Sequence, residues 1–152
     1  MQAIYNKQAG FDYEILEKYQ AGIVLGGQEV KSVKNGQMNL KGAYVAFKHV
    51  PLTELYLINA HISAYKNAGP LPSYDPTRSR KLLLTKKEIK SLIGKSEQKG
   101  LTIAPLKVYT VRNLVKIELG LCRGKKRYEK KEKKKKQDVE KEIRRTLKNN
   151  RV

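Results

Sequence analysis

Apolar and polar side chains alternate along several stretches of this chain. Residues 115–121 place apolar side chains at every second position, and residues 104–109 repeat the pattern. A period of two is typical of a β-strand with one buried face. Residues 110–113 connect the two stretches, so the pattern predicts a β-hairpin. Pro105 lies inside the first strand of this hairpin and indicates a sheet edge or a β-bulge.

Three further stretches have strand character, namely residues 13–25, 43–47 and 55–62. The stretch 13–25 reads either as one long strand or as two strands bent at Ala21-Gly22. Residues 67–79 contain three prolines and a glycine, and this composition predicts a loop.

Two segments break the alternation and predict helices. Residues 28–35 carry an apolar stripe, and Gly36 follows as a C-terminal stop. Thr85 and Glu88 have the spacing of a capping box, which starts a second helix, and Gly94 is expected to end it. Several short strands with two or three short flanking helices predict a mainly β fold, a small antiparallel barrel.

The charge of the chain is strongly positive. It has 33 basic and 14 acidic side chains among 152 residues, a net charge of +19 and a pI near 10.0. Residues 1–122 have a net charge of +9, and residues 123–152 have a net charge of +10. We therefore expect a globular body, residues 1–122, followed by a basic tail, residues 123–152. The single cysteine, Cys122, excludes a disulfide within the chain.

A positive field of this size attracts polyanions, so nucleic acid is the first candidate partner and an anionic membrane the second. The alternative is a solvated, lysine-rich surface. No apolar run approaches the roughly 20 residues that span a bilayer, and the first residues lack the apolar core of a secretory signal. We expect a cytoplasmic protein.

The sequence contains none of the motifs that indicate an enzyme. It has no Walker glycine loop, no G-x-S-x-G, no G-x-G-x-x-G and no Cys/His set with metal-ligand spacing. We therefore expect no catalytic site, metal, cofactor or small-molecule substrate. His61 lies in a strand-like stretch, where a polar position at the rim suits it. If it has a function, contact with an RNA base fits better than catalysis.

Basic and aromatic side chains supply the candidate RNA contacts of the body. Arg78, Arg80 and Lys81 precede three leucines, which predicts a cationic patch on a rigid base; the alternative is a solvated loop. Lys107 and Lys116 lie on the polar faces of the hairpin and can extend the patch. Among the nine tyrosines, those near turns or loops are the better candidates for stacking on bases; they are Tyr19, Tyr65 and Tyr74.

Glu29 is an unusual residue for so basic a chain. It lies in the first turn of the predicted helix, where a carboxylate stabilises the positive helix end by about 0.3–1 kcal/mol. It can equally accept a hydrogen bond from a base or a ribose hydroxyl. The sequence leaves both interpretations open.

The tail is too highly charged to fold alone. Val139, Ile143 and Leu147 are spaced by four, with acidic and basic side chains between them, which indicates a narrow helical stripe. We predict that the tail is disordered in isolation and becomes helical against RNA.

Five blocks of the sequence together resemble the SmpB family, the SsrA-binding proteins of trans-translation. They are AGIxLxGxEVKS at residues 21–32, NAHIS at 59–63, DPxRxRKLLL at 75–84, PLKxY at 105–109 and RGKKxY at 123–128. The blocks run in the order of the family and cover nearly the whole chain.

The resemblance implies an oligonucleotide-binding (OB-type) barrel that binds the tRNA-like domain of transfer-messenger RNA (tmRNA, or SsrA RNA) and carries it to stalled bacterial ribosomes. It implies that the tail enters the empty mRNA channel near the decoding centre, contacts small-subunit rRNA and is helical there. We expect a monomer without membrane contact. The body residues expected to contact RNA are Glu29, Lys31, Ser32, His61, Arg78, Arg80, Lys81, Lys107 and Lys116.

The tail residues expected to contact the ribosome are Gly124, Lys125, Lys126, Tyr128, Glu129, Lys130, Lys131, Ile143, Arg144 and Arg145. The family tail usually continues Tyr-Asp-Lys-Arg, whereas this chain has Glu129 and Lys131 at the two changed positions. Charge is kept there, but the guanidinium fork is lost.

Three rival functions share part of this pattern. A structural ribosomal protein has the same basic body and tail, but it sediments with ribosomes at fixed stoichiometry without stalling. An RNA-processing enzyme needs a set of carboxylates or histidines that this sequence does not assemble. A membrane-surface protein needs a broad apolar helix face, whereas the tail has a narrow stripe.

Overall fold

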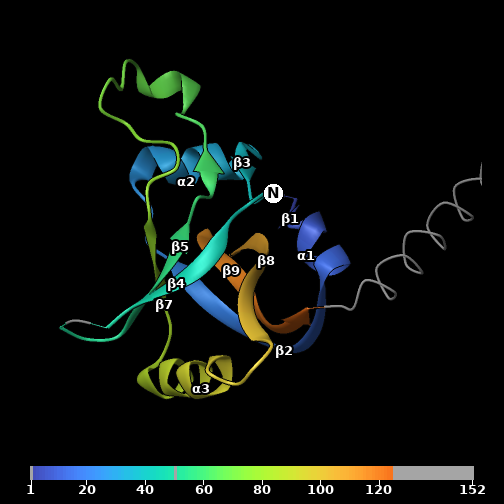
Figure 1. Ribbon diagram of the computed structural model, residues 1–152. Helices are drawn as coiled ribbons and strands as arrows, with labels where there is room; N and C mark the ends of the chain where they lie inside the picture. Colours follow the sequence, from blue (N-terminus) through green and yellow to red (C-terminus); the bar gives the residue numbers. More distant parts are fainter. Residues whose placement is uncertain (1, 50, 125–152) are drawn as a thin grey trace, which may run out of the picture.

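The computed structural model describes residues 2–49 and 51–124, and its main element is an antiparallel sheet of seven strands (Figure 1). Across the sheet the strands are β1 (Ile4–Tyr5), β8 (Leu101–Val111), β9 (Leu114–Gly124), β2 (Tyr13–Ile23), β7 (Arg80–Leu83), β5 (Glu54–Ile58) and β4 (Tyr44–Lys48). A second sheet pairs β3 (Met38–Asn39) with β6 (His61–Ile62). The helices are α1 (Lys7–Asp12), α2 (Gly27–Lys34) and α3 (Lys86–Ser96), and η1 (Lys66–Ala68) is a short 3-10 turn.

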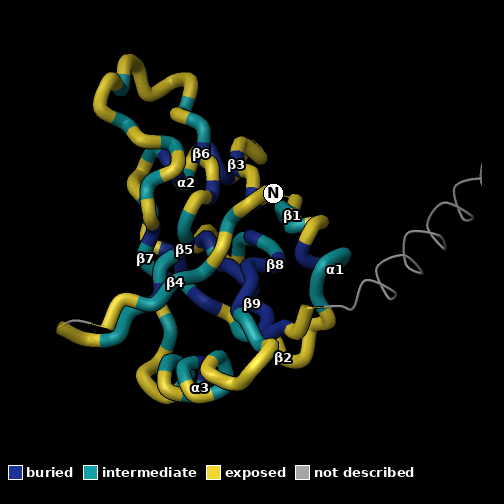
Figure 2. Tube along the Cα trace, viewed as in Figure 1, coloured by how far each residue is buried: buried dark blue, intermediate teal, exposed yellow. Residues whose placement is uncertain are grey.

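The large sheet is curled: β4 at one edge contacts β8, which lies next to the other edge. Its concave side holds the main core, which includes the fully buried Leu55, Leu57, Ile117 and Leu119 (Figure 2). The predicted fold class, a mainly β and antiparallel structure with two or three short helices, is confirmed. α2 and α3 lie at opposite ends of the sheet (Figure 1).

The predicted hairpin is present, and its strands are longer than the alternation indicated. β8 and β9 pair from Leu101 opposite Arg123 to Val111 opposite Leu114. The turn consists of two residues, Arg112 and Asn113, whereas the sequence predicted four connecting residues. The short turn is possible because Arg112 and Asn113 adopt positive φ angles of 49° and 68°. Such turns match the twist of the flanking strands.

The two alternatives at Pro105 and at residues 13–25 are resolved. The register of β8 against β9 shifts between Pro105 and Lys107, so the proline lies at a β-bulge. β2 is one strand that passes through Ala21-Gly22 without a break, although its register shifts between Ile15 and Glu17.

The single strand predicted for residues 55–62 is wrong. Asn59 has a positive φ of 63°, a conformation that asparagine tolerates better than most residues. The chain therefore leaves the large sheet after β5 and enters β6 of the small sheet. This change of sheet carries Ala60 and Ile62 from the barrel to α2.

The helix boundaries were partly predictable. Gly36 ends α2 with a φ of 76°, and the capping box of Thr85 and Glu88 starts α3, both as predicted. Gly94 does not end α3, which continues to Ser96 and is followed by Gly100 with a φ of 83°. α1 was not predicted, since six residues carry too little periodicity. The signal for it is Asn6, whose side chain accepts a hydrogen bond from the N–H of Ala9.

α1 covers a small second core on the outer side of the hairpin. Ala9 packs there with Ala104, Leu106 and Cys122. A Cβ atom at Gly120 would lie 2.9 Å from Leu106 Cδ1 and 3.1 Å from Cys122 Sγ. The absence of a side chain at Gly120 therefore leaves room for Leu106 and Cys122 to pack in this second core.

Replacing Gly120 with alanine is expected to lower the free energy of unfolding by about 1–3 kcal/mol, because the new methyl group overpacks this second core. Urea denaturation measures the change. Gly94→Ala is the matched control, since nothing lies within 4 Å of a Cβ atom at that site near the C-terminal end of α3, and alanine is favoured over glycine inside a helix by about 0.5–1 kcal/mol. Equal stability of the two variants would contradict the close packing.

Candidate nucleic-acid interface

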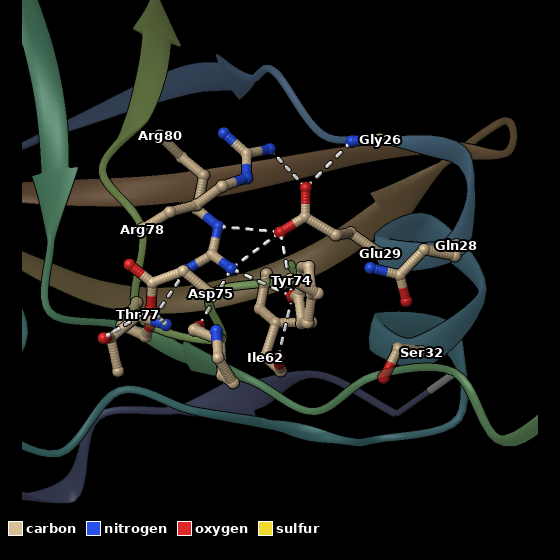
Figure 3. A network of polar contacts seen from close by, with 12 residues as sticks. Gly26, Gln28, Glu29, Ser32, Ile62, Tyr74, Asp75, Thr77, Arg78 and Arg80 are labelled. Carbon is tan, nitrogen blue, oxygen red and sulfur yellow. Dashed lines mark hydrogen bonds and ion pairs between the residues drawn. The ribbon is translucent and has the colours of Figure 1, made fainter. Parts of the chain in front are cut away.

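Glu29 occupies the third position of α2 and is almost completely buried, with 2% of its surface exposed. One carboxylate oxygen, Oε1, accepts a hydrogen bond of 2.9 Å from the N–H of Gly26, which precedes the helix. This contact closes the start of α2, as the helix-end interpretation requires. The carboxylate also points away from the helix, toward two arginines (Figure 3).

Arg80, the first residue of β7, is the centre of the network. Its side chain is 0% exposed. Nε and Nη2 donate to Glu29 Oε2 at 3.0 and 2.6 Å. Nη1 donates to the carbonyl of Ala60 at 2.6 Å, and Nη2 lies 2.9 Å from the carbonyl of Pro76. One guanidinium group thus joins α2, the segment before β6 and the loop before β7.

Arg78 and Tyr74 complete the network. Arg78 Nη2 donates to Glu29 Oε1, and its side chain is 38% exposed. The Tyr74 hydroxyl lies 2.8 Å from the carbonyl of Ile62 and 3.1 Å from Glu29 Oε2, and it accepts from Arg80 Nη2 at 3.2 Å. Since the hydroxyl has one proton, it donates to one of these two oxygens at a time.

The network favours the ionised form of Glu29. Burial by itself would raise the pKa of Glu29. Hydrogen bonds from Arg78, from the backbone of Gly26 and from Arg80, together with the charge of Arg80, lower that pKa from 4.5 to about 2. Glu29 is therefore ionised throughout the physiological range. Burial and the nearby charge of Glu29 raise the pKa of Tyr74, which keeps its proton.

The lowered pKa of Glu29 predicts a loss of stability in acid. A carboxylate whose pKa is lower in the folded state stabilises the protein fully above its unfolded pKa of 4.5. This contribution, about 3 kcal/mol for a shift of this size, is lost as the pH falls from 4.5 toward 2. Urea midpoints measured across this window should fall steeply for the native sequence and less steeply for Glu29→Gln. Parallel curves would contradict the assignment.

The predicted three-cation surface patch at residues 78–81 does not form. Arg80 is buried, Arg78 is bound to Glu29, and Lys81 Nζ lies 3.3 Å from Glu54 Oε1. β7 explains this, because alternate residues of a strand point to opposite sides, which turns Arg80 inward and Lys81 outward. Glu29, an acidic residue in a strongly basic chain, was the available signal, but its distance in sequence from both arginines hid the pairing.

The hairpin lysines, Lys107 and Lys116, lie on the outer face of the sheet, as predicted, and the acidic Glu118 lies on the same face beside Lys107. Glu118, which is 8% exposed, has Lys18 Nζ at 3.7 Å and Lys107 Nζ at 3.8 Å, and it accepts from Gln20 at 3.1 Å. Lys107 also lies over the ring of Tyr109. Lys116 is half-buried and pairs across the ladder with Tyr109.

The remaining predicted residues of the body lie around α2. Lys31 is exposed, and its Nζ is 5.7 Å from the centre of the Tyr65 ring. Ser32 is buried and donates to the carbonyl of Ser63 at 2.5 Å. His61 is exposed and pairs with Asn39 in the small sheet. Gln28, which sequence reasoning missed, accepts from the N–H of Tyr65 at 2.9 Å.

Of the three tyrosines singled out for stacking, Tyr65 lies beside a lysine on the α2 side and Tyr74 belongs to the buried network. Tyr19 accepts a hydrogen bond of 3.2 Å from Lys95, which also binds Glu17. Of the predicted tail residues, Gly124 ends β9 opposite Tyr13. The others, Lys125, Lys126, Tyr128, Glu129, Lys130, Lys131, Ile143, Arg144 and Arg145, lie outside the described residues.

Within residues 2–49 and 51–124, no three His, Cys, Asp or Glu side chains are grouped in a way that could hold a metal ion. The same residues include no helix of the length and apolar character needed to cross a membrane.

Comparison with known proteins decides the family. Residues 3–149 match the family described as SmpB protein. The chain belongs to the SmpB family. An SsrA-binding protein of Sulfurihydrogenibium sp. is 50% identical over 143 residues, covering 94% of this chain and 91% of the relative. That of Enterococcus faecalis is 45% identical over 146 residues, covering 96% and 92%.

A solved structure supports the same assignment. It is described as "tmRNA-SmpB: a journey to the center of the bacterial ribosome", is 47% identical and has a TM-score of 0.66, covering 86% of this chain and 92% of that chain. The resemblance to the SmpB family, first seen in sequence blocks, is confirmed.

Three of the five blocks that resemble the SmpB family meet in the buried network. Glu29 belongs to the first block, Ala60 and Ile62 to the NAHIS block, and Arg80 to the DPxRxRKLLL block. These residues are far apart in the sequence, and Arg80 contacts the first two blocks directly. A physical reason for these three blocks is therefore that together they build one ion-pair network.

Proposed function

We propose that this chain binds SsrA RNA through its tRNA-like domain and brings it to stalled bacterial ribosomes for trans-translation. The observation that carries the proposal is the match to the SmpB family over residues 3–149, together with relatives named SsrA-binding protein that cover nearly the whole chain. The similar solved structure, described as tmRNA-SmpB of the bacterial ribosome, supports the ribosomal partner.

The charges of the body support binding of a folded RNA. Four predicted cations, Arg78, Arg80, Lys81 and Lys107, lie within 4 Å of carboxylates. Lys31 and Lys116 have no such partner among the described residues. Free ammonium groups on a rigid surface neutralise phosphates, while the paired cations mainly hold that surface in shape.

The proposal assigns a second role to residues 123–152. Their net charge of +10 favours a channel walled by rRNA phosphates, and the stripe of Val139, Ile143 and Leu147 favours a helix that forms on contact. The tail would occupy the empty mRNA channel near the decoding centre. In this scheme the chain is a cytoplasmic, monomeric adaptor that carries out no covalent chemistry of its own.

Crosslinking tests the proposal directly. The full chain is crosslinked to RNA in cells, and the recovered RNA is sequenced; SsrA RNA and small-subunit rRNA should dominate. Sedimentation separates the rival of a structural ribosomal protein, because an adaptor associates with ribosomes in proportion to stalling. Recovery of rRNA alone, at a constant ratio to ribosomes, would overturn the proposal.

A further inference from the structure

A polar pocket lies between the C-terminal end of α2 and the segment that follows β6. Its volume is about 290 Å³, close to the lower end of the range of roughly 300–1,000 Å³ for small-molecule sites. Its walls come from two separate segments, residues 32–37 and residues 63–67. It is separate from the Glu29 network, although α2 contributes to both.

The residues that line this pocket are suited to a nucleotide. Asn35 and Gln37 present exposed amide groups, and neither side chain has a hydrogen-bond partner among the described residues. An amide offers a donor beside an acceptor, which matches the edge of a base. Tyr65 adds an aromatic ring, and no Asp or Glu is among the lining residues.

Two lysines lie at the same pocket. Lys66 lines the pocket, and Lys31 lies over the ring of Tyr65. Neither lysine has a carboxylate within 4 Å in the described part of the chain. When the base of a nucleotide enters the pocket, its 5′-phosphate, carried by the ribose, would therefore lie near two ammonium groups that no ion pair engages.

The walls of the pocket are held in place before any ligand arrives. Ser32 Oγ donates to the carbonyl of Ser63 at 2.5 Å, and the N–H of Ser63 donates to the carbonyl of Gln37 at 3.1 Å. The N–H of Gln37 donates in turn to the carbonyl of Ser32 at 3.0 Å. Tyr65 is tied to α2 through Gln28. A preformed site spends less free energy on ordering when it binds.

We propose that this pocket receives one unpaired nucleotide of the bound RNA. Asn35 and Gln37 hydrogen-bond the edge of the base, and Lys31 and Lys66 contact its phosphate. The inference rests on the proposed function for the identity of the RNA. It adds a site that recognises a base to a surface whose other proposed contacts are with the RNA backbone. Sites of this kind in RNA-binding proteins bind bases that are unstacked and turned outward.

Nuclear magnetic resonance tests the pocket without SsrA RNA. The full chain, labelled with nitrogen-15, is titrated with adenosine, cytidine, guanosine and uridine 5′-monophosphates, and with ribose 5-phosphate. At least one nucleotide should cause saturable shifts of the side-chain amides of Asn35 and Gln37 and of residues 63–67, with a Kd in the millimolar range. Equal shifts with ribose 5-phosphate, or no saturable shift at these groups, would overturn the proposal.

A second experiment uses SsrA RNA. Asn35→Ala combined with Gln37→Ala should weaken binding at fixed salt about tenfold and expose one nucleotide to chemical probes. Gln98→Ala is the control, because Gln98 is also exposed but lies just after α3, away from the pocket; this variant should bind normally. If the native protein binds SsrA RNA and the double variant binds it equally well, the pocket assignment is wrong while the proposed function stands. If native protein does not prefer SsrA RNA, the proposed function fails while the titration still reports on the pocket.

Discussion

Replacing Arg80 with methionine is expected to lower the free energy of unfolding by about 3–5 kcal/mol, because it leaves a buried carboxylate without its main partner. Glu29 would lose two hydrogen bonds, and the carbonyl of Ala60 would lose its bond from Nη1. Methionine keeps much of the volume, so the loss reports on charge and hydrogen bonding. Urea denaturation at neutral pH provides the measurement.

Lys81→Met is the matched control. Lys81 is the next residue of β7, but its side chain is 43% exposed and its partner Glu54 is also accessible, so the same substitution should change stability little. The double variant Glu29→Gln with Arg80→Met should be more stable than Arg80→Met, since the unpaired charge is gone. Equal losses for Arg80→Met and Lys81→Met would show that the network contributes no special stability.

Ending the chain after Gly124 is expected to abolish ribosome rescue while leaving binding of SsrA RNA nearly intact. The cut belongs there and not after Cys122, because Arg123 and Gly124 still pair with Glu14 and Tyr13 in the sheet. The body keeps a net charge above +9 and every described candidate contact. Filter binding at fixed salt and a rescue assay on stalled ribosomes measure the two effects separately.

Proline at Ile143 tests how the tail acts. It keeps the charge of the tail but costs a helix interior about 3 kcal/mol. Damaged rescue would indicate that the tail acts as a helix, whereas normal rescue would reduce it to an electrostatic tether. Loss of specific RNA binding by the folded, shortened chain would contradict the division into a binding body and an acting tail.

Local patterns predicted the elements whose signals lie within a few residues. The alternation of residues 115–121 gave β9, the spacing of Thr85 and Glu88 gave the start of α3, and Gly36 gave the end of α2. The division at Asn59 escaped prediction, because a positive φ at asparagine is an option that the sequence permits without requiring. α1 escaped because its stability comes from packing Ala9 on the sheet.

The candidate site was harder to predict, since its interactions join distant parts of the chain. The sequence singled out Glu29, Arg78 and Arg80, and all three are brought together. It did not indicate that they would meet one another, because ion pairs across about 50 residues leave no periodic signal. The pocket at Asn35 and Gln37 was missed for a similar reason, as neither residue is unusual in composition or spacing.

β9 is a long strand inside the large sheet. Its 11 residues extend about 35 Å at the rise of an antiparallel strand. Lys116, the third residue of β9, pairs with Gly22 shortly before α2, and the last residue, Gly124, pairs with Tyr13 at the start of β2. In the proposed function, RNA bound at α2 and the residues after Gly124 are therefore held apart by a strand that is paired on both sides, with β8 and with β2. Under that proposal the length of β9 sets the distance between the two binding regions, and a change in its length would move one of them out of reach.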